Sequence, residues 1–440
     1  MKLLVVGNGG REHAIAWKLS QSPVVTDLAV APGNAGTARI ARNVPIDPTY
    51  IDGLHRYVRD TGVDLTVVGP EVPLAGGIVD RFQQDGMSIF GPTKGAALIE
   101  SSKTFAKDLM RRHGVPTADA ESFTSFEAAS RHVESRDFPA VVKADGLAAG
   151  KGVTVAQTAP EAVEVLAELM VDKRLGAAGE RVLIEDCLEG PEVSVFAFVA
   201  GTYVSTMVAA CDYKRVGDGD VGPNTGGMGS YSPPPFWTQD LDDQVRAEIM
   251  EPVARALVSE GRPYSGVLYA GLMLTPEGPM VIEFNCRMGD PETQAILPRL
   301  NTDLAEIMAG TVVSSNSDGA VGTTSLSDRR RLQDISIDWA PSSCVGVVVA
   351  SGGYPGHYET GHLIEGLGDL DADVTAFHAG TVEASDTTGS APGVLTDGGR
   401  VLAISASGDT LVEARAQAYA NVDRIKFKDS FFRRDIAALA

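Results

Sequence analysis

The sequence predicts a protein of several domains that combines α/β and α+β architecture. The chain has 440 residues, more than one ordinary domain holds, and its 44% of hydrophobic residues is typical of globular proteins. The first hundred residues repeat a short apolar run, a glycine-bearing turn and a helix, which indicates a parallel sheet. From Val193 onward the pattern is that of an antiparallel sheet.

Apolar segments in the N-terminal region end at turns that contain glycine. The predicted strands are 3–6, 28–31, 65–68 and 88–90, and the first predicted helix is 12–19. In a parallel sheet, ligands bind at the carboxyl ends of the strands, and all four turns fall at that edge. We therefore expect a Rossmann-like substrate domain over residues 1–102.

The middle of the chain is expected to form a module over residues 103–312, with a lid at roughly 117–190. Its predicted helices are 102–113, 161–170 and 240–260, and its predicted strands are 140–143, 152–156, 181–185, 193–199, 268–274 and 280–284. The stretch 314–327 is polar and lacks periodicity, so residues 313–343 are interpreted as a linker or insertion. A small α/β domain is expected over 344–440, from strands 345–350, 373–377 and 401–405 and a helix at 410–421.

Charge and composition exclude several classes of protein. A formal net charge of −21 argues against nonspecific binding to nucleic acid or to anionic membranes. No apolar run reaches the roughly 18 residues that a membrane span requires. The apolar run at the N-terminus is too short for the hydrophobic region of a signal peptide. The four cysteines are scattered and suggest neither disulfides nor a zinc site. We expect a cytoplasmic protein that is a monomer or a weak dimer.

The first chemical motif is the turn at residues 7–13, Gly-Asn-Gly-Gly-Arg-Glu-His. Glycines let the backbone approach a phosphate, and a helix N-terminus supplies N–H donors. A nicotinamide fingerprint would place a third glycine at position 12, where this chain has Glu12, and an acid at the end of the second strand, where it has Ala31-Pro32. The motif therefore predicts a site for a small phosphorylated ligand, with tight packing of the turn as the structural alternative.

The second motif is the glycine-rich segment 142–153. It differs from a P-loop because three residues separate Gly146 from Gly150, and Gly152 stands where Ser or Thr would bind magnesium. The segment lies between two predicted strands, so it is expected to be a mobile hairpin that closes over a triphosphate. Lys143, on the entering strand, is expected to reach the phosphates.

The third and fourth motifs carry acids at the ends of strands. Residues 184–188 followed by Glu192 would suit a nucleoside, although solvated surface acids are the simpler interpretation of this segment alone. Glu283 and Asn285 are two residues apart on a strand and so face the same way, whereas Ile282 and Phe284 are expected to face the core. Hard oxygen ligands suit magnesium, which completes its shell with water and phosphate. Arg287 would then meet phosphoryl oxygens.

The fifth motif consists of residues 212–215 and 223–229. Its glycines and polar groups are atypical of a core element, so it is interpreted as a loop that lines a pocket.

Taken together, the motifs resemble the ATP-grasp superfamily and, within it, the phosphoribosylamine–glycine ligases. The resemblance runs from Met1 to about Gly310 and again from Val345 to the end. It is carried by residues 7–13, 32–36, 68–71, 143–153, 212–215, 223–229, 282–294 and 352–356. It implies an ATP-grasp fold with an N-terminal Rossmann-like domain, a hinged lid and a small C-terminal α/β domain.

The resemblance also implies a reaction in de novo purine biosynthesis that uses ATP and Mg²⁺ or Mn²⁺. The glycine carboxylate attacks the γ-phosphate of ATP to give glycyl phosphate. The amine of 5-phosphoribosylamine then attacks the acyl carbon, which yields glycinamide ribonucleotide, ADP and phosphate. Such chemistry needs positioning and charge neutralisation more than covalent help.

The implied site residues fall into four groups. The catalytic group is Arg287, Lys143, Asp212 and Lys214. The ATP-binding group is Lys103, Lys143, Gly146, Gly150, Lys151, Gly152, Glu185, Asp186, Leu188 and Glu192. The group that binds glycine and 5-phosphoribosylamine is Gly9, Gly10, Arg11, Glu12, Asn34, Glu71, Asn224, Asp290, Pro291, Glu292 and Thr293. The metal ligands are Glu283 and Asn285.

Two departures from the superfamily stand out, and three other functions stay open. The segment 269–272 carries no acid where many ATP-grasp enzymes have a further metal ligand, and 313–343 is longer and more polar than expected. The nearest alternative is another ATP-grasp carboxylate–amine ligase or a carboxylase. A nicotinamide oxidoreductase and a catalytically inactive nucleotide-binding regulator are the others. Glu12 and the missing ribose acid argue against the oxidoreductase, and the intact Lys143, Glu283, Asn285 and Arg287 argue against the inactive regulator.

Overall fold

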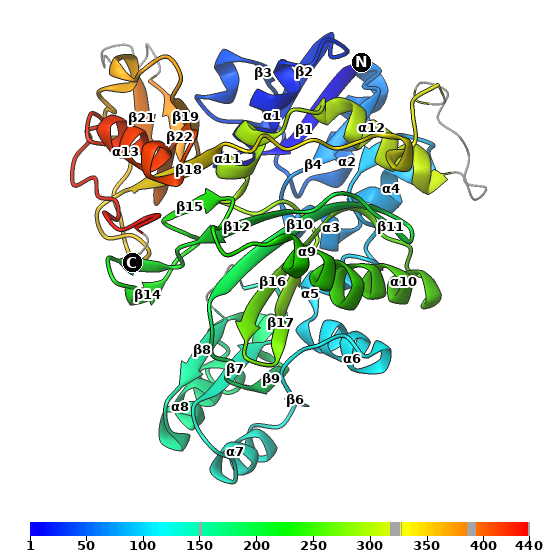
Figure 1. The fold of residues 1–440 in the computed structure, drawn as a ribbon, viewed down its shortest axis with the longest axis vertical. Coiled ribbons are helices and arrows are strands. Elements are labelled where there is room, and N and C mark those ends of the chain that lie inside the picture. The colour runs from blue at the N-terminus through cyan, green and yellow to red at the C-terminus, as the bar shows by residue number, and fades with distance from the viewer. Residues whose placement is uncertain (149–151, 317–325, 327, 385–392, 439–440) are drawn as a thin grey trace.

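The structure is a computed structural model that describes residues 1–148, 152–316, 326, 328–384 and 393–438. Figure 1 shows the N-terminal domain at the top, the lid projecting at the bottom and the C-terminal domain at the upper left. Helices α9 (Gln239–Val245) and α10 (Glu251–Ser259) lie on the right of this view. They correspond to the helix expected over 240–260, and a π-helical turn at Arg246–Met250 joins them.

The N-terminal domain is built on a parallel sheet, as the repeated turns predict. Its strands pair in the order β3-β2-β1-β4-β5. They are β1 (Lys2–Gly7), β2 (Asp27–Pro32), β3 (Arg42–Asn43), β4 (Leu65–Val68) and β5 (Ile89–Phe90). The helices of this region are α1 (Gly10–Ser20), α2 (Ile51–Thr61), α3 (Glu71–Gly76), α4 (Ile78–Gln84) and α5 (Leu98–Ser101). The turns after β1, β2, β4 and β5 therefore lie along one edge of the sheet.

The lid is an antiparallel sheet with two helices and its own core. Its strands pair in the order β6-β9-β7-β8, after helix α6 (Lys103–His113). They are β6 (Ala120–Phe123), β7 (Ala140–Ala144), β8 (Val153–Ala156) and β9 (Val182–Asp186). Helices α7 (Phe126–Glu134) and α8 (Ala159–Met170) bury Val133, Leu166 and Leu169 against it. The core of this segment is separate from the two larger cores of the described chain.

A large antiparallel sheet runs from the middle of the chain into the C-terminal domain. Its order is β17-β16-β10-β12-β15-β18-β22-β19, with β11 beside β10. The strands are β10 (Glu192–Ala200), β11 (Tyr203–Val204), β12 (Val208–Asp212), β15 (Gly229–Ser232), β16 (Ser265–Thr275), β17 (Gly278–Asn285), β18 (Ser343–Ala350), β19 (Thr375–His378) and β22 (Arg400–Gly408). Pairing of β15 with β18 joins the two regions into one sheet.

Short elements complete the fold. They are the hairpins β13 (Arg215–Gly217) with β14 (Val221–Asn224) and β20 (Thr381–Glu383) with β21 (Val394–Thr396), and the helices α11 (Thr293–Ile296), α12 (Leu304–Asn316) and α13 (Leu411–Val422). Helix α12 extends into the segment 313–343, which the sequence suggested was a linker. Leu332, Ile335 and Ile337 of that segment are buried in the same core as α12, so part of it is packed structure.

The N- and C-terminal domains touch through α1 and β19. The backbone N–H of His378 donates to Nδ1 of His13 at 2.7 Å. Burial, the largest cause, lowers the pKa of His13 to about 3 and that of His378 to about 4, and Arg39 acts in the same direction. The two imidazoles are therefore neutral at physiological pH.

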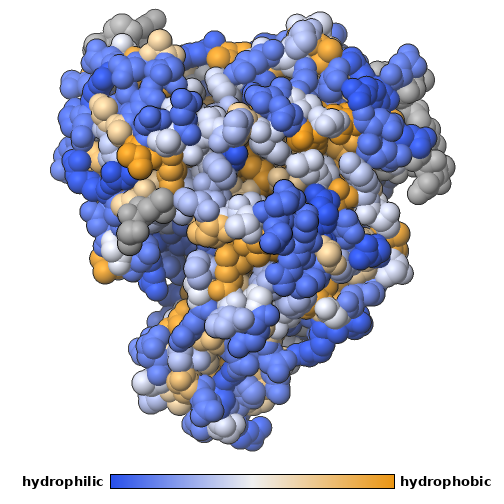
Figure 2. All heavy atoms as spheres, viewed as in Figure 1, coloured by the Kyte–Doolittle hydropathy of each residue, from blue (hydrophilic) through white to orange (hydrophobic). Residues whose placement is uncertain are grey.

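Hydrophilic side chains dominate the face of the molecule in Figure 2, with small apolar groups among them. No helix in the described ranges is long and apolar enough to cross a membrane.

Candidate active site

Glu283 and Asn285 lie at the end of β17, where the ladder with β16 is irregular. Gly271 pairs with Glu283 while Leu272 pairs with Val281, so Ile282 is an extra residue in a β-bulge. Phe284 is buried as expected, but the expectation that Ile282 faces the core is wrong, because the bulge leaves it only half-buried. The carbonyl of Ile282 instead accepts a hydrogen bond of 3.0 Å from Lys143 Nζ.

The carboxylate of Glu283 is surrounded by positive charge. Burial alone would raise its pKa, but the ammonium groups of Lys214, Lys103 and Lys143 lower it below the ordinary value. Glu283 is therefore ionised at neutral pH. Lys143 and Lys214 also pair with Glu185 and Glu192, so the lysines belong to a network with several acids. Their ammonium groups are of the type that donates to phosphate oxygens.

The donor set at Glu283 fits a hard divalent cation. Asn285 Nδ2 lies 3.5 Å from Glu283 Oε1, and Arg287 Nη2 donates to Asn285 Oδ1 at 3.1 Å. One ionised carboxylate and one amide oxygen are the ligand types that Mg²⁺ and Mn²⁺ take, with phosphate and water for the rest of the shell. No group of three or more His, Cys, Asp or Glu side chains is arranged for a metal in the described part of the chain.

A buried triad of Lys143, Glu185 and Lys107 lies beside this group. Glu185 Oε2 is 2.8 Å from Lys143 Nζ, and Glu185 Oε1 is 3.4 Å from Lys107 Nζ. Burial, opposed by Glu185, lowers the pKa of Lys107 to about 8. Lys107 was not among the residues predicted from the sequence, although it lies four residues after Lys103 on a predicted helix and hence on the same face.

Glu185 and Asp186 are adjacent on β9 and point to opposite faces. The side chain of Glu185 is buried in the triad, whereas that of Asp186 is exposed and pairs with Arg136. Leu188 is half-buried in the turn that follows. The structure thus brings Glu185 to the cluster and leaves the Asp186 carboxylate outside it.

The loop after β12 contributes Asp212 and Lys214. Lys214 Nζ lies 2.5 Å from Glu192 Oε2. Burial would lower the pKa of Lys214, but Asp212, Glu192 and Glu283 raise it above the ordinary value. Burial, followed by Glu292 and the other acids, raises the pKa of Asp212 to about 7, against the effect of Lys214. The pKa of each of these two residues therefore depends on the charges of its neighbours.

Lys103 connects this cluster to the glycine-rich hairpin. Its Nζ donates to the carbonyl of Gly146 at 3.4 Å, and burial lowers its pKa. The carbonyl of Gly152 accepts from Ala144 N at 2.8 Å. A Cβ added at Gly152 would lie 2.8 Å from the Cβ of Ala148, which is closer than an ordinary contact. Gly150 and Lys151, expected at the tip of this hairpin, lie outside the described residues.

Arg287 joins the β17 cluster to the N-terminal domain. Its guanidinium lies 3.2 Å from Glu71 Oε2 and 3.0 Å from Glu100 Oε1. Burial would lower the pKa of Arg287, but the two carboxylates raise it. Glu100 also accepts from the Cys286 N–H at 2.7 Å. Nothing in the sequence around Glu100 indicated this role, because the contact depends on the packing of α5 against β17.

The glycine turn after β1 encloses a carboxylate of the protein itself. Glu12 Oε2 accepts from Gly9 N at 2.7 Å, and Glu12 Oε1 lies 2.6 Å from Arg11 Nε. A Cβ at Gly7 or Gly69 would come within 2.3 or 2.1 Å of Glu12. These glycines therefore make room for Glu12, and the Gly9 N–H that was expected to face a phosphate is already engaged.

The side chain of Asn34 is fully used within the protein. Its Nδ2 donates to the carbonyls of Asn8 and His378, both at 2.8 Å, and its Oδ1 accepts from Gly36 and Thr37 at 2.9 and 3.0 Å. Asn34 thus fixes the turn after β2 against the C-terminal domain.

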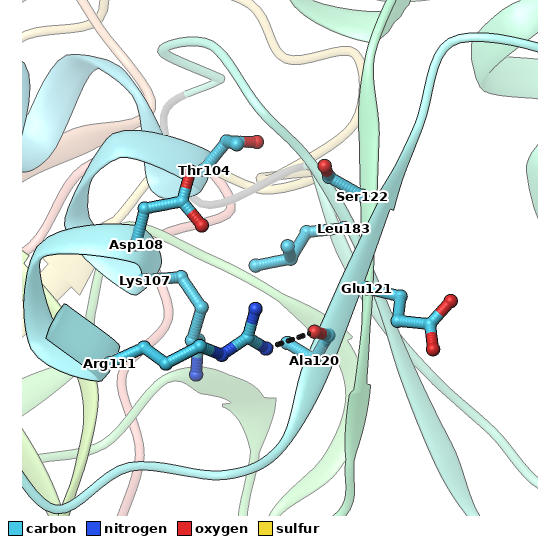
Figure 3. A pocket seen from close by; sticks show the side chains of 8 residues that line it. All are labelled: Thr104, Lys107, Asp108, Arg111, Ala120, Glu121, Ser122 and Leu183. Carbon is cyan, nitrogen blue, oxygen red and sulfur yellow. Dashed lines mark hydrogen bonds between the residues drawn. The ribbon is translucent and has the colours of Figure 1, made fainter.

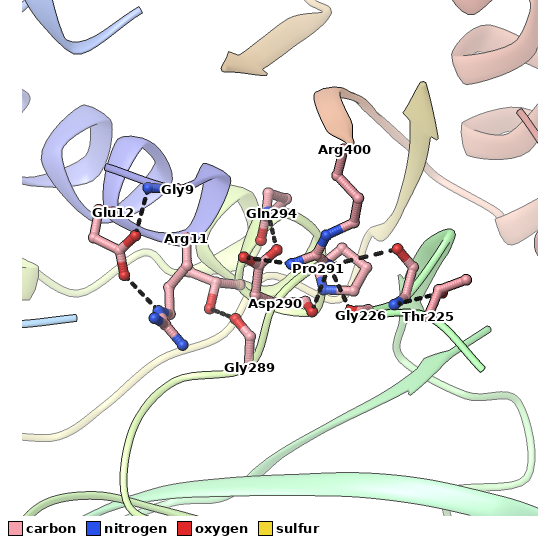
Figure 4. Close-up of polar contacts among 12 residues, drawn as sticks. Gly9, Arg11, Glu12, Thr225, Gly226, Gly289, Asp290, Pro291, Gln294 and Arg400 are labelled. Atoms are coloured by element: carbon pink, nitrogen blue, oxygen red, sulfur yellow. Dashed lines mark hydrogen bonds and ion pairs between the residues drawn. The ribbon is translucent and has the colours of Figure 1, made fainter. Parts of the chain in front are cut away.

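Asp290 is held by a residue of the C-terminal domain, Arg400 (Figure 4). Arg400 Nη2 lies 3.0 Å from Asp290 Oδ2, and its Nη1 donates to the carbonyls of Asp290 and Gly226. Burial would raise the pKa of Asp290, but Arg400 and Arg11 lower it. No local signal marks Arg400, because it is more than a hundred residues from Asp290 in the chain.

The remaining residues expected at the substrate site make internal contacts. Pro291 packs on Gly227, where a Cβ would be 2.3 Å from the proline ring. Glu292 accepts from Tyr269 OH at 2.8 Å, and Thr293 Oγ1 donates to Gly289 O at 2.5 Å. Asn224 is half-buried at the end of β14, opposite Arg215.

A pocket of about 160 Å³ lies between α6 and the edge of the lid sheet. Figure 3 shows Thr104, Asp108 and Arg111 on the helix opposite β6, with Arg111 bonded to the carbonyl of Ala120 and the side chain of Glu121 pointing away from the helix. None of the site residues expected from the sequence lines it, although Lys107 does. The pocket adjoins the triad but is not the cluster around Glu283.

Comparisons with solved structures agree with this fold. Phosphoribosylamine–glycine ligase from Thermotoga maritima is 30% identical, with a TM-score of 0.81, and the match covers 99% of this chain and 100% of that one. The biotin carboxylase domain of the Hydrogenobacter thermophilus 2-oxoglutarate carboxylase is 13% identical, with a TM-score of 0.69 over 98% of this chain and 91% of that one, which shows a shared fold alone. Fold and site define an ATP-grasp ligase.

Family models give the narrower assignment. Those for phosphoribosylglycinamide synthetase match residues 1–100 (N domain), 101–293 (ATP-grasp A domain) and 344–439 (C domain). The phosphoribosylamine–glycine ligase of Halalkalibacterium halodurans is 47% identical over 440 residues, covering 100% of this chain and 97% of the relative. That of Escherichia coli K12 is 46% identical, covering 99% and 98%. The chain belongs to the phosphoribosylglycinamide synthetase family, a family of ATP-using ligases that performs the glycine-ligation step of purine biosynthesis.

Proposed function

We propose that this chain uses ATP and a divalent cation to activate glycine as glycyl phosphate and passes the glycyl group to 5-phosphoribosylamine. The products are glycinamide ribonucleotide, ADP and phosphate. One observation carries the proposal, namely the ionised Glu283 beside Asn285 with the ammonium groups of Lys103, Lys143 and Lys214 around it. That arrangement is suited to a triphosphate and to the charge that develops when a carboxylate attacks its γ-phosphate.

The residues around Glu283 would have different roles in binding the metal, the phosphates and the hairpin. Glu283 and Asn285 would hold Mg²⁺ or Mn²⁺, which, when bound, neutralises phosphate charge and orients the triphosphate. Lys143, fixed by Glu185 and by the carbonyl of Ile282, presents its ammonium group to the phosphates. Lys103 tethers the hairpin at Gly146, which would exclude water from the acyl phosphate when the lid closes.

The substrate side is assigned to the group around Arg287. Arg287 is held by Glu71 and Glu100, which would fix its planar guanidinium for contact with phosphoryl oxygens. Asp290, ionised and held by Arg400, would accept from the amine of 5-phosphoribosylamine. Arg11 and Glu12 line the same side. In keeping with soluble substrates, we further propose a cytoplasmic monomer or weak dimer.

Substrate-dependent release of ADP tests the proposal. Release with glycine and 5-phosphoribosylamine together, and little with either alone, is the expected result. Release only with bicarbonate or formate would contradict it and favour the carboxylase alternative. A chelator is expected to abolish turnover while circular dichroism stays unchanged, and added Mg²⁺ or Mn²⁺ is expected to restore it.

A further inference from the structure

Gln294 carries a polar atom for which the fold provides no partner. Its side chain is 1% exposed and lies on α11, beside the first turn of α1. Its Nε2 donates to Asp290 Oδ1 at 2.9 Å. In the part of the chain that the structure describes, its Oε1 has no hydrogen-bond partner. Buried acceptors without donors are rare and costly, so each calls for an explanation.

The orientation of this amide is fixed by its neighbours. A carboxylate only accepts hydrogen bonds, and the low pKa of Asp290 keeps it ionised. The nitrogen of Gln294 must therefore face Asp290, because turning the amide over would set two acceptors against each other. Arg400 fixes Asp290 in turn, at 3.0 Å. Gln294 Oε1 is thus held in one direction and cannot satisfy itself by rotation.

Gln294 packs closely against the start of α1. A Cβ at Gly10 would come within 2.6 Å of Gln294 Nε2, so only glycine at the first residue of the helix leaves the amide its place. Figure 4 shows Gln294, Asp290 and Arg400 together, with Arg11 on the neighbouring helix α1 and Gly9 just before it. The free acceptor therefore lies among residues already assigned to the substrate side.

We propose that Gln294 Oε1 accepts a hydrogen bond from an N–H or O–H group of 5-phosphoribosylamine. The inference rests on the proposed function and adds a specificity residue to it. The substrate carries an amine and two ring hydroxyls, and the neutral acceptor of Gln294 stands next to the ionised acceptor of Asp290. A site that presents buried acceptors rejects ligands that lack the matching donors, because the acceptors then stay unpaired.

Binding of the product glycinamide ribonucleotide, measured by calorimetry, tests this contact without turnover. Gln294→Met keeps the length and shape of the side chain and removes both its acceptor and the Nε2 donor to Asp290. We expect its Kd for the product to rise about tenfold to hundredfold, as for loss of one hydrogen bond at a buried site, with the Kd for ATP unchanged. If the Met variant does not fold, Gln294→Asn, which withdraws the acceptor by one methylene, should show the same selective loss.

Ser405→Ala is the matched control. Ser405 Oγ is also buried and without a partner among the described residues, but it lies on β22. Its removal should leave both Kd values unchanged. Equal product binding by wild type and Gln294→Met would overturn the inference. No product binding by the wild type would overturn the proposed function and this contact together.

1,4-Anhydroribitol 5-phosphate distinguishes the two donors. It keeps both ring hydroxyls and carries only hydrogen at C1, where the substrate has its nitrogen. A parallel loss of affinity for both ligands in Gln294→Met would assign the contact to a hydroxyl. A loss for glycinamide ribonucleotide alone would assign it to the nitrogen. Either result supports the inference.

Discussion

Arg400 Nη2 and Asp290 Oδ2 lie 3.0 Å apart, and this ion pair joins a strand of the C-terminal domain to the loop that follows β17. The same guanidinium bonds the backbone carbonyls of Asp290, Gly226 and Gly227. Tyr354, also of the C-terminal domain, accepts from Gly226 N at 2.9 Å. The C-terminal domain therefore shapes the site without supplying an expected ligand of ATP.

Arg400→Met should impair the substrate side selectively. Losing the guanidinium frees Asp290 and the 226–227 loop, so we expect kcat/KM for 5-phosphoribosylamine to fall about tenfold to hundredfold. The KM for ATP should change little. The control is Arg424→Met, which breaks an exposed pair with Asp371 in the same domain and should have no kinetic effect. A parallel rise in both KM values would contradict the selective role.

Glu283→Gln should abolish turnover and spare the fold. The substitution keeps the shape of the side chain but removes the charge that faces the three lysines, and loss of such a group costs on the order of a hundredfold or more in kcat. ADP release and the melting temperature measure the two effects. Glu277→Gln, at the exposed turn before β17, is the control. Near-normal activity of Glu283→Gln would remove Glu283 from the metal site.

Glu185→Gln should destabilise the protein as well as weaken ATP binding. It leaves Lys143 and Lys107 buried with like charges and no carboxylate between them, and breaking a buried pair costs about 3–5 kcal/mol. Urea unfolding measures the loss, and the KM for ATP should rise. The neighbouring Asp186→Asn breaks only an exposed pair with Arg136 and should change stability by less than about 1 kcal/mol. Similar losses in both variants would contradict the buried triad.

His13→Asn should make the free energy of unfolding depend less on pH below 6.5. In the folded protein burial lowers the pKa of His13 from 6.5 to about 3, so between these values the unfolded chain binds more protons. The free energy of unfolding therefore falls as pH drops below 6.5, by at most about 1.4 kcal/mol per pH unit for one histidine. Asn keeps an acceptor for the His378 N–H and has no proton to bind. Urea unfolding at pH 7 and pH 5 should show a smaller difference than in wild type; an equal difference would mean that His13 does not carry this effect.

The sequence predicted those parts of the site that depend on local spacing. The interval between Glu283 and Asn285 places both on one face of a strand, and the glycine-bearing turns fall at one edge of the parallel sheet. The bulge at Ile282 escaped prediction because a bulge depends on register with the partner strand, here β16. The same displacement exposes the carbonyl that receives Lys143.

Contacts between segments far apart in the chain could not be predicted from the sequence. Arg400 meets Asp290 only because β22 joins the large sheet. The glycine turn illustrates a second limit. Its glycines indicate that another group lies close to the backbone, and the structure shows that this group is the side chain of Glu12 from the same turn. A spacing rule describes the room that glycines leave but not the group that enters it.

The shared sheet has a consequence for any attempt to divide this chain. Because β15 pairs with β18, a cut near residue 340 severs backbone hydrogen bonds of a continuous ladder instead of passing through a hinge. A fragment that ends there would carry β15 as a bare edge, and such edges recruit strands from other molecules. Exchange of C-terminal domains between relatives would therefore have to preserve strand register as well as side chains.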